Sequence, residues 1–381
     1  MDTIFNHKFI VFGTYSPNTL GQIRSLGEKG IKPIVVLVYK NTFRIDKSKY
    51  ISKLYDVKNI EEGLGLIVEK YGFEKYTPFI YTDRDDIMGL LDRNYDQLKD
   101  RFYFWNAGEQ GRLNKYLNKK SQIQLAKECG FDVIATEVVR IGELPRKLLY
   151  PIFTKAVDSL NPWWKGFTHI CNDEKQLIDA YSQMKDISEI ILQQYIEKKD
   201  EMPINCISLN GGRVIKTIGR TVYYRLQKDS FGSFRYVRSF EDKELEKKIK
   251  LFIMKVGYTG PFQIEFIVDK SGKKYFLETN FRLAQQDYAF TKLGINVPYE
   301  YAMAILNGNM VFDNEIRFDR ISIMSEFEDF RIACLHGDVS FWQWMKDVCQ
   351  TDCFQFYNKD DLLPFFYTLW SKIKETIKHK L

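Results

Sequence analysis

Two segments near residue 270 alternate between apolar and polar residues, and this pattern restricts the fold of the chain more than any other. In PFQIEF (261–266), the apolar side chains take one face of an expected strand and Glu265 takes the other. In YFLETN, Glu278 and Asn280 are two residues apart and therefore also share a face. Ser271-Gly272 between the segments is a turn signal. We therefore expect an antiparallel hairpin that brings two carboxylates and an amide oxygen together.

The composition is that of a globular chain with two or three domains. The protein has 381 residues, of which 45% are hydrophobic and 28% are charged, and these fractions exclude a disordered chain. At about 150 residues per domain, a single packed core is not expected. No apolar run of about 18 residues predicts a transmembrane helix, and the start MDTIFNHKFIVFG lacks the features of a secretory signal.

Charge and cysteine content exclude two further classes of protein. The net charge is +6, from 56 Lys and Arg against 50 Asp and Glu, and the two signs are interspersed except in the basic tail at 372–380. Nucleic-acid-binding proteins concentrate their basic residues, so nucleic acid is not expected as a partner. Six cysteines and four histidines, with only a loose Cys349/Cys353 pair, argue against a zinc site. We expect reduced thiols and a cytoplasmic protein.

The first 113 residues alternate between strand and helix patterns. Short β-branched or aromatic runs predict strands at 8–13, 33–39, 78–82 and 102–105, and residues at helical spacing separate several of them. This alternation predicts a small doubly wound domain over 1–113. The first loop, FGTYSPNTLG, lacks the G-x-G-x-x-G spacing, so a dinucleotide site is not expected there.

The pattern changes after residue 113. Strand patterns occur at 133–140, 150–156 and 189–196, with a helical stretch at 173–185 between the last two. Four more, at 203–210, 211–220, 261–268 and 274–280, predict an antiparallel sheet, and Gly211-Gly212 is a two-residue hairpin signal. Residues 311–381 form a third region, rich in aromatic side chains.

Three groups of residues could carry chemistry. The oxygens of the expected hairpin suit Mg²⁺, which proteins normally share with substrate phosphates, although such acids are often solvated or paired with lysine. Lys119 opens a helix and Lys155 ends an apolar strand, where a buried ammonium group needs an anion such as phosphate. In ILQQYIEKKD, Gln193 could meet a base edge and Asp200 ribose hydroxyls, although an ordinary edge strand explains the segment more simply.

The order and spacing of these elements resemble the ATP-grasp superfamily of ligases. The resemblance covers NKKSQIQLAKECGFDVIAT, YPIFTKA, EIILQQYIEKKD and GPFQIEFIVDKSGKKYFLETNFR, and extends over residues 1–310. It implies an α/β fold (α+β in the C-terminal lobe): a doubly wound pre-ATP-grasp domain, then a two-lobed ATP-grasp domain with antiparallel sheets. The implied boundaries are 1–113 for the first domain, 114–310 for the second (small lobe 114–195, large lobe 196–310) and 311–381 for the C-terminal region.

The resemblance also implies roles for particular residues. Lys119 and Lys155 would contact the phosphates of ATP, and Glu265, Glu278 and Asn280 would hold Mg²⁺, or Mn²⁺ in its place. The remaining implied contacts are Gln193, Tyr195 and Ile196 at the adenine edge, Asp200 at the ribose, and Arg282 at an acyl phosphate or the carboxylate substrate. Arg220, in RVIKTIGR, is a further candidate for the phosphate region.

One segment departs from the pattern of the superfamily. A glycine-rich loop usually follows the second lysine, but here the stretch is DSLNPWWKG, which retains only Gly166. A cradle of backbone amides around the phosphates is therefore not expected there. Lys165 or the rings of Trp163 and Trp164 are the alternatives for covering ATP.

The expected function is an ATP-dependent carboxylate–amine ligase that forms an amide through an acyl phosphate and releases ADP and phosphate. The layout and the ending DLLPFFYTLW resemble D-aspartate ligases and relatives from bacterial envelope polysaccharide clusters, so an amino acid or sugar acid is the expected substrate class. The alternatives are a carboxylase or thioester-forming ligase and a non-catalytic ATP-binding module. The partners expected are small molecules, and a homodimer is compatible with the sequence.

The tail carries a second pattern. Apolar residues of 362–377 recur near one side of an expected helix, and Lys372, Lys374, Lys378 and Lys380 lie elsewhere. Such helices bind membrane surfaces or dock on their own domain, and we expect docking.

Overall fold

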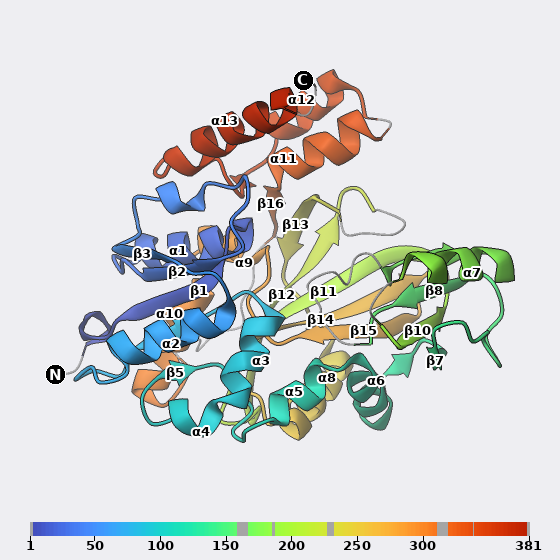
Figure 1. Ribbon diagram of the computed structural model, residues 1–381, viewed down its shortest axis with the longest axis horizontal. Helices are drawn as coiled ribbons and strands as arrows, with labels where there is room; N and C mark the ends of the chain where they lie inside the picture. The colour runs from blue at the N-terminus through green and yellow to red at the C-terminus, as the bar shows by residue number, and fades with distance from the viewer. Residues whose placement is uncertain are drawn as a thin grey trace.

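The computed structural model describes residues 3–157, 167–184, 187–226, 232–310, 319–337 and 339–378. Within these ranges the chain forms three β-sheets with helices around them (Figure 1). The loop with Trp163, Trp164 and Lys165, on which one expectation rests, lies outside the described residues. No helix in the described ranges is both long and apolar enough to cross a membrane.

The N-terminal segment forms a five-stranded parallel sheet with the order β3-β2-β1-β4-β5. The strands are β1 (Phe9–Thr14), β2 (Ile34–Val38), β3 (Lys53–Asp56), β4 (Phe79–Tyr81) and β5 (Tyr103–Phe104). Its helices are α1 (Pro17–Glu28), α2 (Ile60–Tyr71), α3 (Asp85–Arg93) and α4 (Tyr95–Leu98), with 3-10 turns at Ile4–Asn6 and Ile45–Lys47.

Helices cover both faces of this sheet because the residues of its strands alternate between two apolar clusters. In β1, Ile10 and Phe12 pack with side chains of α2 and α3, whereas Phe9 and Val11 pack with side chains of α1. This confirms the expected doubly wound arrangement. The sequence patterns missed β3, because none of its residues is fully buried and it has no apolar run.

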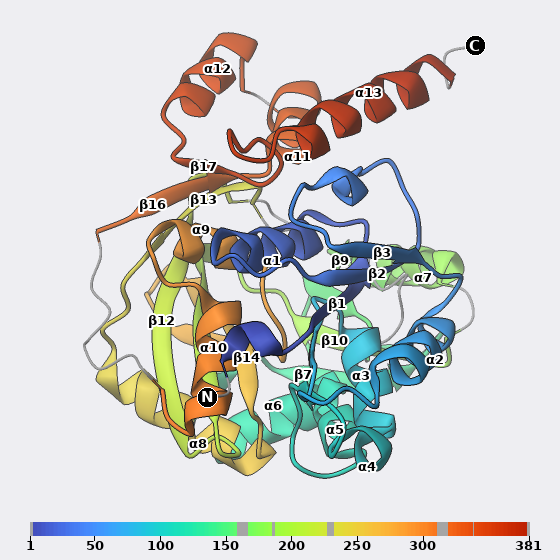
Figure 2. The same cartoon turned by 90° about the vertical axis from the view of Figure 1, so that its left-hand side faces the viewer.

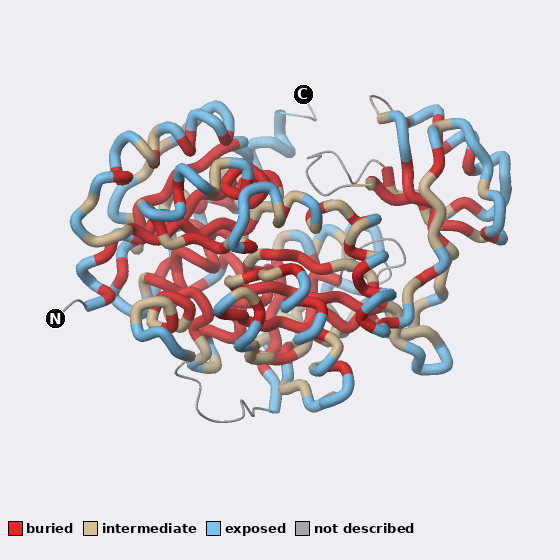
Figure 3. Tube along the Cα trace, turned by 90° about the horizontal axis from the view of Figure 1, so that it is seen from below, coloured by how far each residue is buried: buried red, intermediate tan, exposed pale blue. Residues whose placement is uncertain are grey.

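A second, four-stranded antiparallel sheet has the order β7-β10-β8-β9. Its strands are β7 (Thr136–Arg140), β8 (Ile152–Lys155), β9 (Ile170–Cys171) and β10 (Glu189–Gln194), and helix α7 (Glu174–Gln183) packs on one face. This small sheet and α7 form a lobe at one side of the molecule, clear of the buried strands in the main body (Figure 3).

The third sheet has eight strands in the order β17-β16-β13-β12-β11-β14-β15-β6. The strands are β6 (Asp132–Val133), β11 (Lys198–Leu209), β12 (Val214–Tyr223), β13 (Phe234–Arg238), β14 (Gly260–Asp269), β15 (Lys274–Asn280), β16 (Ile321–Met324) and β17 (Cys353–Phe354). The accompanying helices are α5 (Arg112–Leu117), α6 (Lys119–Glu128), α8 (Lys243–Val256), α9 (Asp287–Lys292) and α10 (Val297–Asn307). All the central pairs are antiparallel, as expected.

Two details of the sequence prediction were wrong. The segment 133–140 is not one strand: Val133 pairs with Phe276 in the large sheet, and Thr136 pairs with Gln193 in the small one, so the chain changes sheets between them. The hairpin between β11 and β12 has a four-residue loop rather than two, because Asn210 adopts a positive φ of 52° before the two glycines.

The C-terminal region extends the large sheet with β16 and β17 and adds α11 (Glu326–Asp329), a π-helical turn (Phe330–Leu335), α12 (Phe341–Cys349) and α13 (Leu363–Lys378). In two perpendicular views this region lies above the N-terminal sheet (Figures 1 and 2).

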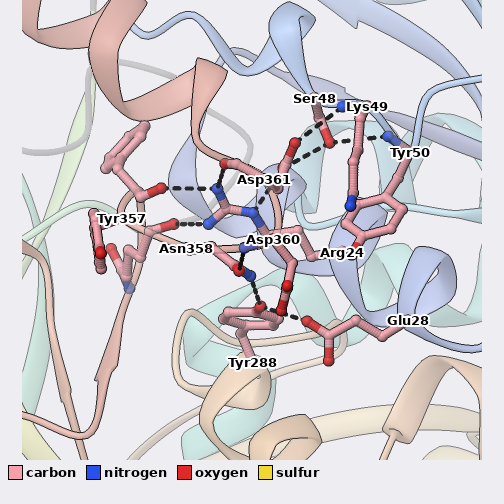
Figure 4. Close-up of polar contacts among 12 residues, drawn as sticks. Arg24, Glu28, Ser48, Lys49, Tyr50, Tyr288, Tyr357, Asn358, Asp360 and Asp361 are labelled. Atoms are coloured by element: carbon pink, nitrogen blue, oxygen red, sulfur yellow. Dashed lines mark hydrogen bonds and ion pairs between the residues drawn. The ribbon is translucent and has the colours of Figure 1, made fainter.

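Arg24 of α1 joins the two parts. Its side chain is fully buried, and it donates hydrogen bonds to Asp361 Oδ2 at 3.0 Å and to the carbonyl oxygens of Gln355 and Phe356 at 2.8 and 2.7 Å (Figure 4). Asp361 in turn accepts a hydrogen bond from Ser48 Oγ at 2.8 Å. A buried guanidinium is tolerated only when its donors are satisfied in this way.

Replacing this arginine should therefore destabilise the protein strongly. Arg24→Met leaves the Asp361 carboxylate buried without its cation, and removal of one partner of a buried ion pair costs about 3–5 kcal/mol of folding free energy. Urea unfolding followed by circular dichroism measures the loss. Exposed Arg93→Met is the control and should change stability by less than about 0.5 kcal/mol; equal midpoints for the two variants would contradict this role for Arg24.

Candidate functional site

The β14–β15 hairpin brings the predicted acids together. Glu265 lies directly opposite Glu278, and Gln263 lies opposite Asn280. A bulge shifts the register next to Glu265, so that Phe276 pairs with Phe266. Without it, Phe276 and Glu278 would share a face, being two residues apart. The bulge thus separates the acids from the aromatic side chains.

A chain of hydrogen bonds runs from this hairpin to helix α3 beside the N-terminal sheet. Asn280 Nδ2 donates to Glu265 Oε1 at 2.8 Å, and Arg282 Nη2 donates to Asn280 Oδ1 at 3.1 Å. Arg282 Nε donates to Asp85 Oδ1, at the start of α3, at 3.0 Å. Asn280 and Arg282 are therefore held in fixed orientations by the carboxylates on either side of them.

Asp85 was missed by the sequence analysis, although a signal was present. The run TDRDD at 82–86 follows β4 directly. The sheet order changes direction between β1 and β4, and ligands of open parallel sheets bind in the crevice outside the strand ends at such a point. Asp83 in the same run is buried and accepts hydrogen bonds from Ser16 Oγ at 2.8 Å and Thr19 Oγ1 at 2.9 Å.

Two buried lysines from different elements converge on Glu278. Lys119, the first residue of α6, and Lys155, the last of β8, each place Nζ 3.2 Å from Glu278 Oε2. The lysine residues are 5% and 8% exposed. Two like charges this close together are tolerated because they share one carboxylate. This ion pair joins the small sheet to the large one.

The surroundings shift the pKa values of the two acids in opposite directions. Burial raises the pKa of Glu265, and the nearby charges of Glu278 and Glu201 add to the shift. Burial also disfavours the charged form of Glu278, but Lys119 and Lys155 outweigh it and hold the pKa of Glu278 well below its usual range. Burial lowers the pKa of Lys155.

The small sheet presents Gln193 on the same face as Lys155. In β10, Ile190 and Leu192 pack toward α7, so Ile191 and Gln193 point the other way. Lys155 pairs with Ile191 and shares that face. Gln193 Nε2 donates to Thr136 Oγ1 at 3.1 Å. Tyr195 and Ile196, both half-buried, follow in the segment that connects this sheet to β11.

The structure does not bring Asp200 and Arg220 to this cluster. Arg220 Nη1 lies 3.9 Å from Asp200 Oδ2. Ile204 is opposite both Arg220 and Ile264, so these three residues share a face, and Glu265, the next residue of β14, lies on the other. Asp200, four residues before Ile204, shares the face of Arg220.

Glu201 is the acid of β11 that faces the cluster. It lies opposite Ile267, two residues from Glu265, and is 6% exposed beside Lys198, with which it forms an ion pair. The pairing of β11 is regular from Asp200 to Ile204, so alternation places Glu201 on the face of Glu265 and Asp200 on the opposite face. The acidic pair Asp200-Glu201 was visible in the sequence, but the face of β11 that meets the cluster was not.

Arg235 of β13 is a second residue that the sequence analysis missed. It lies opposite Tyr223, is 3% exposed, and donates to Gln285 Oε1 at 2.5 Å. Tyr223 is three residues after Arg220, so Tyr223 and Arg235 lie on the other face of the sheet, which is the face of Glu201 and Glu265. Burial raises the pKa of Tyr223, and the charge of Arg235 opposes this shift. The sequence FRYVR gave no signal that this arginine is buried.

The oxygen donors of the hairpin suit a hard divalent cation. In the described ranges, no group of three or more His, Cys, Asp and Glu residues is placed to hold a metal ion. The set here is two carboxylates, Glu265 and Glu278, and the amide of Asn280. So few protein oxygens fit Mg²⁺, which keeps waters and takes further ligands from substrate phosphates.

A scan against protein-family models finds no match. Among curated proteins, the 2-oxoglutarate carboxylase small subunit of Hydrogenobacter thermophilus is 24% identical over 208 residues, which are 51% of this chain and 43% of that protein. The matched region thus spans less than half of that relative.

Solved structures match over more of the chain. The L-amino acid ligase from Bacillus licheniformis has a TM-score of 0.64 and 14% identity, covering 83% of this chain and 80% of that one. The biotin carboxylase domain of the Hydrogenobacter thermophilus 2-oxoglutarate carboxylase, solved with MgADP and bicarbonate, has a TM-score of 0.63 and 17% identity (82% and 73%). The N5-carboxyaminoimidazole synthetase of Staphylococcus aureus has a TM-score of 0.61 and 15% identity (85% and 83%).

These similarities establish the fold. The chain has the ATP-grasp fold, which confirms the fold that the sequence resemblance implied, with a parallel sheet combined with antiparallel ones.

The raised pKa of Glu265 makes the stability of the metal-free protein depend on pH. Between the ordinary glutamate pKa of about 4.3 and its raised value, the folded protein holds a proton that the unfolded chain has lost, so stability falls as pH rises. Glu265→Gln removes this titration and keeps an oxygen for Asn280. Chemical denaturation in EDTA at several pH values should show a flatter profile for Glu265→Gln than for the wild type; parallel profiles would show that Glu265 titrates normally.

Proposed function

We propose that the protein is an ATP-dependent ligase that joins a carboxylate to an amine through an acyl phosphate. The observation that carries this proposal is the convergence of Lys119 and Lys155, from two elements, on Glu278 of the hairpin. Two cations beside oxygen donors for a divalent cation are what a triphosphate requires. A purely structural ion pair needs neither the second lysine nor the second acid.

Each residue of the cluster then has a role. Lys119 and Lys155 neutralise the ATP phosphates. Glu265, Glu278 and Asn280 would hold Mg²⁺, which would supply positive charge beside the transferred phosphoryl group. Gln193, Tyr195 and Ile196 lie where the two sheets connect and contact the adenine. Glu201 replaces Asp200 as the acid for the ribose, because it faces the cluster, and Arg235 replaces Arg220 as the additional cation.

The chemistry needs positioning rather than a protein nucleophile. A carboxylate oxygen of the substrate attacks the γ-phosphorus of ATP, and the bond to the β-phosphate oxygen breaks, releasing ADP. The amine then attacks the acyl carbon, loses a proton, and displaces inorganic phosphate. Arg282, oriented by Asp85 and Asn280, binds the acyl phosphate and neutralises its charge.

A carboxylase is the second candidate function. The curated relative is a carboxylase subunit, and one similar structure contains bicarbonate. Phosphorylation of bicarbonate would use the same lysines and acids as phosphorylation of an organic carboxylate. The two functions differ in the acid that accepts the phosphoryl group, which is bicarbonate in one and an organic carboxylate in the other. The assay must therefore include both acids.

The decisive experiment is a screen for ADP release with Mg-ATP, or Mn-ATP, and pairs of carboxylates and amines. Amino acids and the sugar acids of envelope polysaccharides form the main set, and bicarbonate with biotin or an amine forms a second arm. We propose a cytoplasmic reaction, since all six cysteines are unpaired in the structure. Binding of Mg-ATP without ADP release in any pair would leave only the non-catalytic ATP-binding module.

Replacing Glu278 should separate catalysis from binding. Glu278→Gln removes the charge that holds the metal, so turnover should fall on the order of 10²-fold or more. The affinity for ATP should change much less, because Lys119 and Lys155 lose a competing anion and stay available to the phosphates. Coupled ADP-release kinetics and titration calorimetry measure the two effects. Glu244→Gln, at an exposed acid of α8, is the control; equal losses in binding and turnover would contradict the assigned role.

Replacing Lys155 should instead impair nucleotide binding. Lys155→Met removes a direct cation from the phosphates, and the dissociation constant for Mg-ATP should rise about 10- to 100-fold. Lys119→Met should behave alike. The matched control is Lys120→Met, since Lys120 follows Lys119 in α6 but is exposed. Unchanged ATP affinity in Lys155→Met, measured by calorimetry, would show that the phosphates bind elsewhere.

A further inference from the structure

The last helix turns its apolar side away from the protein. Leu363, Phe366, Trp370, Ile373 and Ile377 recur at spacings of three and four residues, so they form one stripe along α13. These residues are 53%, 54%, 58%, 43% and 53% exposed. A continuous exposed apolar stripe of this kind marks an interaction surface.

The opposite side of α13 holds the helix on the protein. Pro364 and Thr368 are its buried residues, and Thr368 Oγ1 accepts a hydrogen bond from the backbone N–H of Arg44 at 2.9 Å. Phe365 stacks on Phe327 with ring centroids 5.4 Å apart, and Lys372 Nζ lies 4.7 Å from the ring centroid of Phe43. The helix is therefore docked, as the sequence suggested, and it makes this contact through the side opposite the stripe.

Positive charge follows the edge of the stripe. Lys374 and Lys378 are four and eight residues after Trp370 and lie beside it; Lys374 Nζ is 5.1 Å from the Trp370 ring centroid. Within α13 the single acid is Glu375, which is exposed and lies seven residues after Thr368, on the side of the helix that carries the buried residues. The outer edge of the helix is thus basic and without an acid of its own.

A second exposed aromatic group lies at the same end of the molecule. α12 has no buried residue in its described length, and Phe341 and Trp342 are 51% and 79% exposed. α12 and α13 both project at the end that carries β16 and β17, beyond the N-terminal sheet (Figures 1 and 2). Tryptophan and phenylalanine beside lysine are the side chains that favour the boundary between lipid headgroups and acyl chains.

We propose that α13 binds the surface of an anionic lipid membrane, lying in its plane with the stripe of Leu363, Phe366, Trp370, Ile373 and Ile377 inserted among the headgroups. Anionic headgroups supply the negative charge that the edge at Lys374 and Lys378 lacks. A second copy of the chain fits this face less well. Pairing two such stripes would bring four of these lysines to one seam without an acid on the outer side of the helix to neutralise them.

The first test is flotation of the full-length protein with vesicles of phosphatidylcholine, with or without phosphatidylglycerol. The wild type should float with the anionic vesicles at low salt and much less with the neutral ones. Lys374→Glu/Lys378→Glu should weaken this binding about tenfold or more. Lys175→Glu/Lys250→Glu, an equal charge change at exposed lysines of α7 and α8, should not. Failure of the wild type to float, or an equal loss in both variants, would overturn the proposal.

The second test addresses the stripe itself. Trp370→Ser/Ile373→Ser should abolish flotation while leaving the unfolding temperature unchanged, because both side chains are exposed. Phe5→Ser/Phe73→Ser, at residues 64% and 88% exposed near the N-terminal sheet, is the control and should float like the wild type. Vesicles with brominated acyl chains should quench the wild type more than Trp370→Phe. Equal quenching, or a solution dimer that Trp370→Ser/Ile373→Ser dissociates, would contradict membrane binding and assign the face to a second copy.

Discussion

The register of the β14–β15 hairpin determines where the charged groups of the site lie. Phe266 and Phe276 pair on the face toward α8, where Phe131 and Phe252 pack against Phe276. This aromatic packing fixes the hairpin, because a shift by one residue would expose the rings and turn the acids into the core. The bulge beside Glu265 then lets Glu278 face away from the rings only two residues after Phe276. The acids are thus placed by the apolar side of the same hairpin.

Buried charge connects the small sheet to the large one. Lys119 and Lys155 are each too deeply buried to remain charged without an anion, and Glu278 provides it for both. Lys155 comes from the small sheet, whereas Lys119 comes from α6, which packs on the large sheet, so each side contributes one cation to this carboxylate. Glu278 already neutralises part of the charge of the two lysines and orients them. A bound polyphosphate would add further negative charge beside lysines that are already in position.

A separate buried charge, that of Arg24, fixes the segment that leads into α13. Arg24 ties the N-terminal helix to the segment before α13, and its carbonyl and carboxylate partners come from residues more than three hundred positions away in the chain. With that segment fixed, α13 contacts the protein through Thr368, Phe365 and Lys372 rather than through its apolar stripe. The contacts that hold this segment and α13 on the protein therefore leave the apolar stripe of α13 at the surface.

The sequence by itself determined the features that depend on local pattern. Strand–helix alternation gave the doubly wound sheet, and the spacing of Glu278 and Asn280, together with the turn at Ser271-Gly272, gave the hairpin and its shared face. These follow from the two-residue period of a strand, which any register preserves.

The tertiary structure alone decided what depends on bulges and on distant packing. The bulge beside Glu265 turns Glu278 away from the face of Phe276, although the two are only two residues apart, and alternation cannot reveal a bulge because it shifts the pairing without a signal in the composition. Asp85 meets Arg282 across nearly two hundred residues of chain, and Lys119 meets Lys155 at Glu278, only because three sheets pack in one particular way. The side of α13 that faces outward also depends on the tertiary structure. The apolar periodicity of a helix is the same whether its apolar side is covered or exposed, and only the neighbouring side chains determine which side is covered.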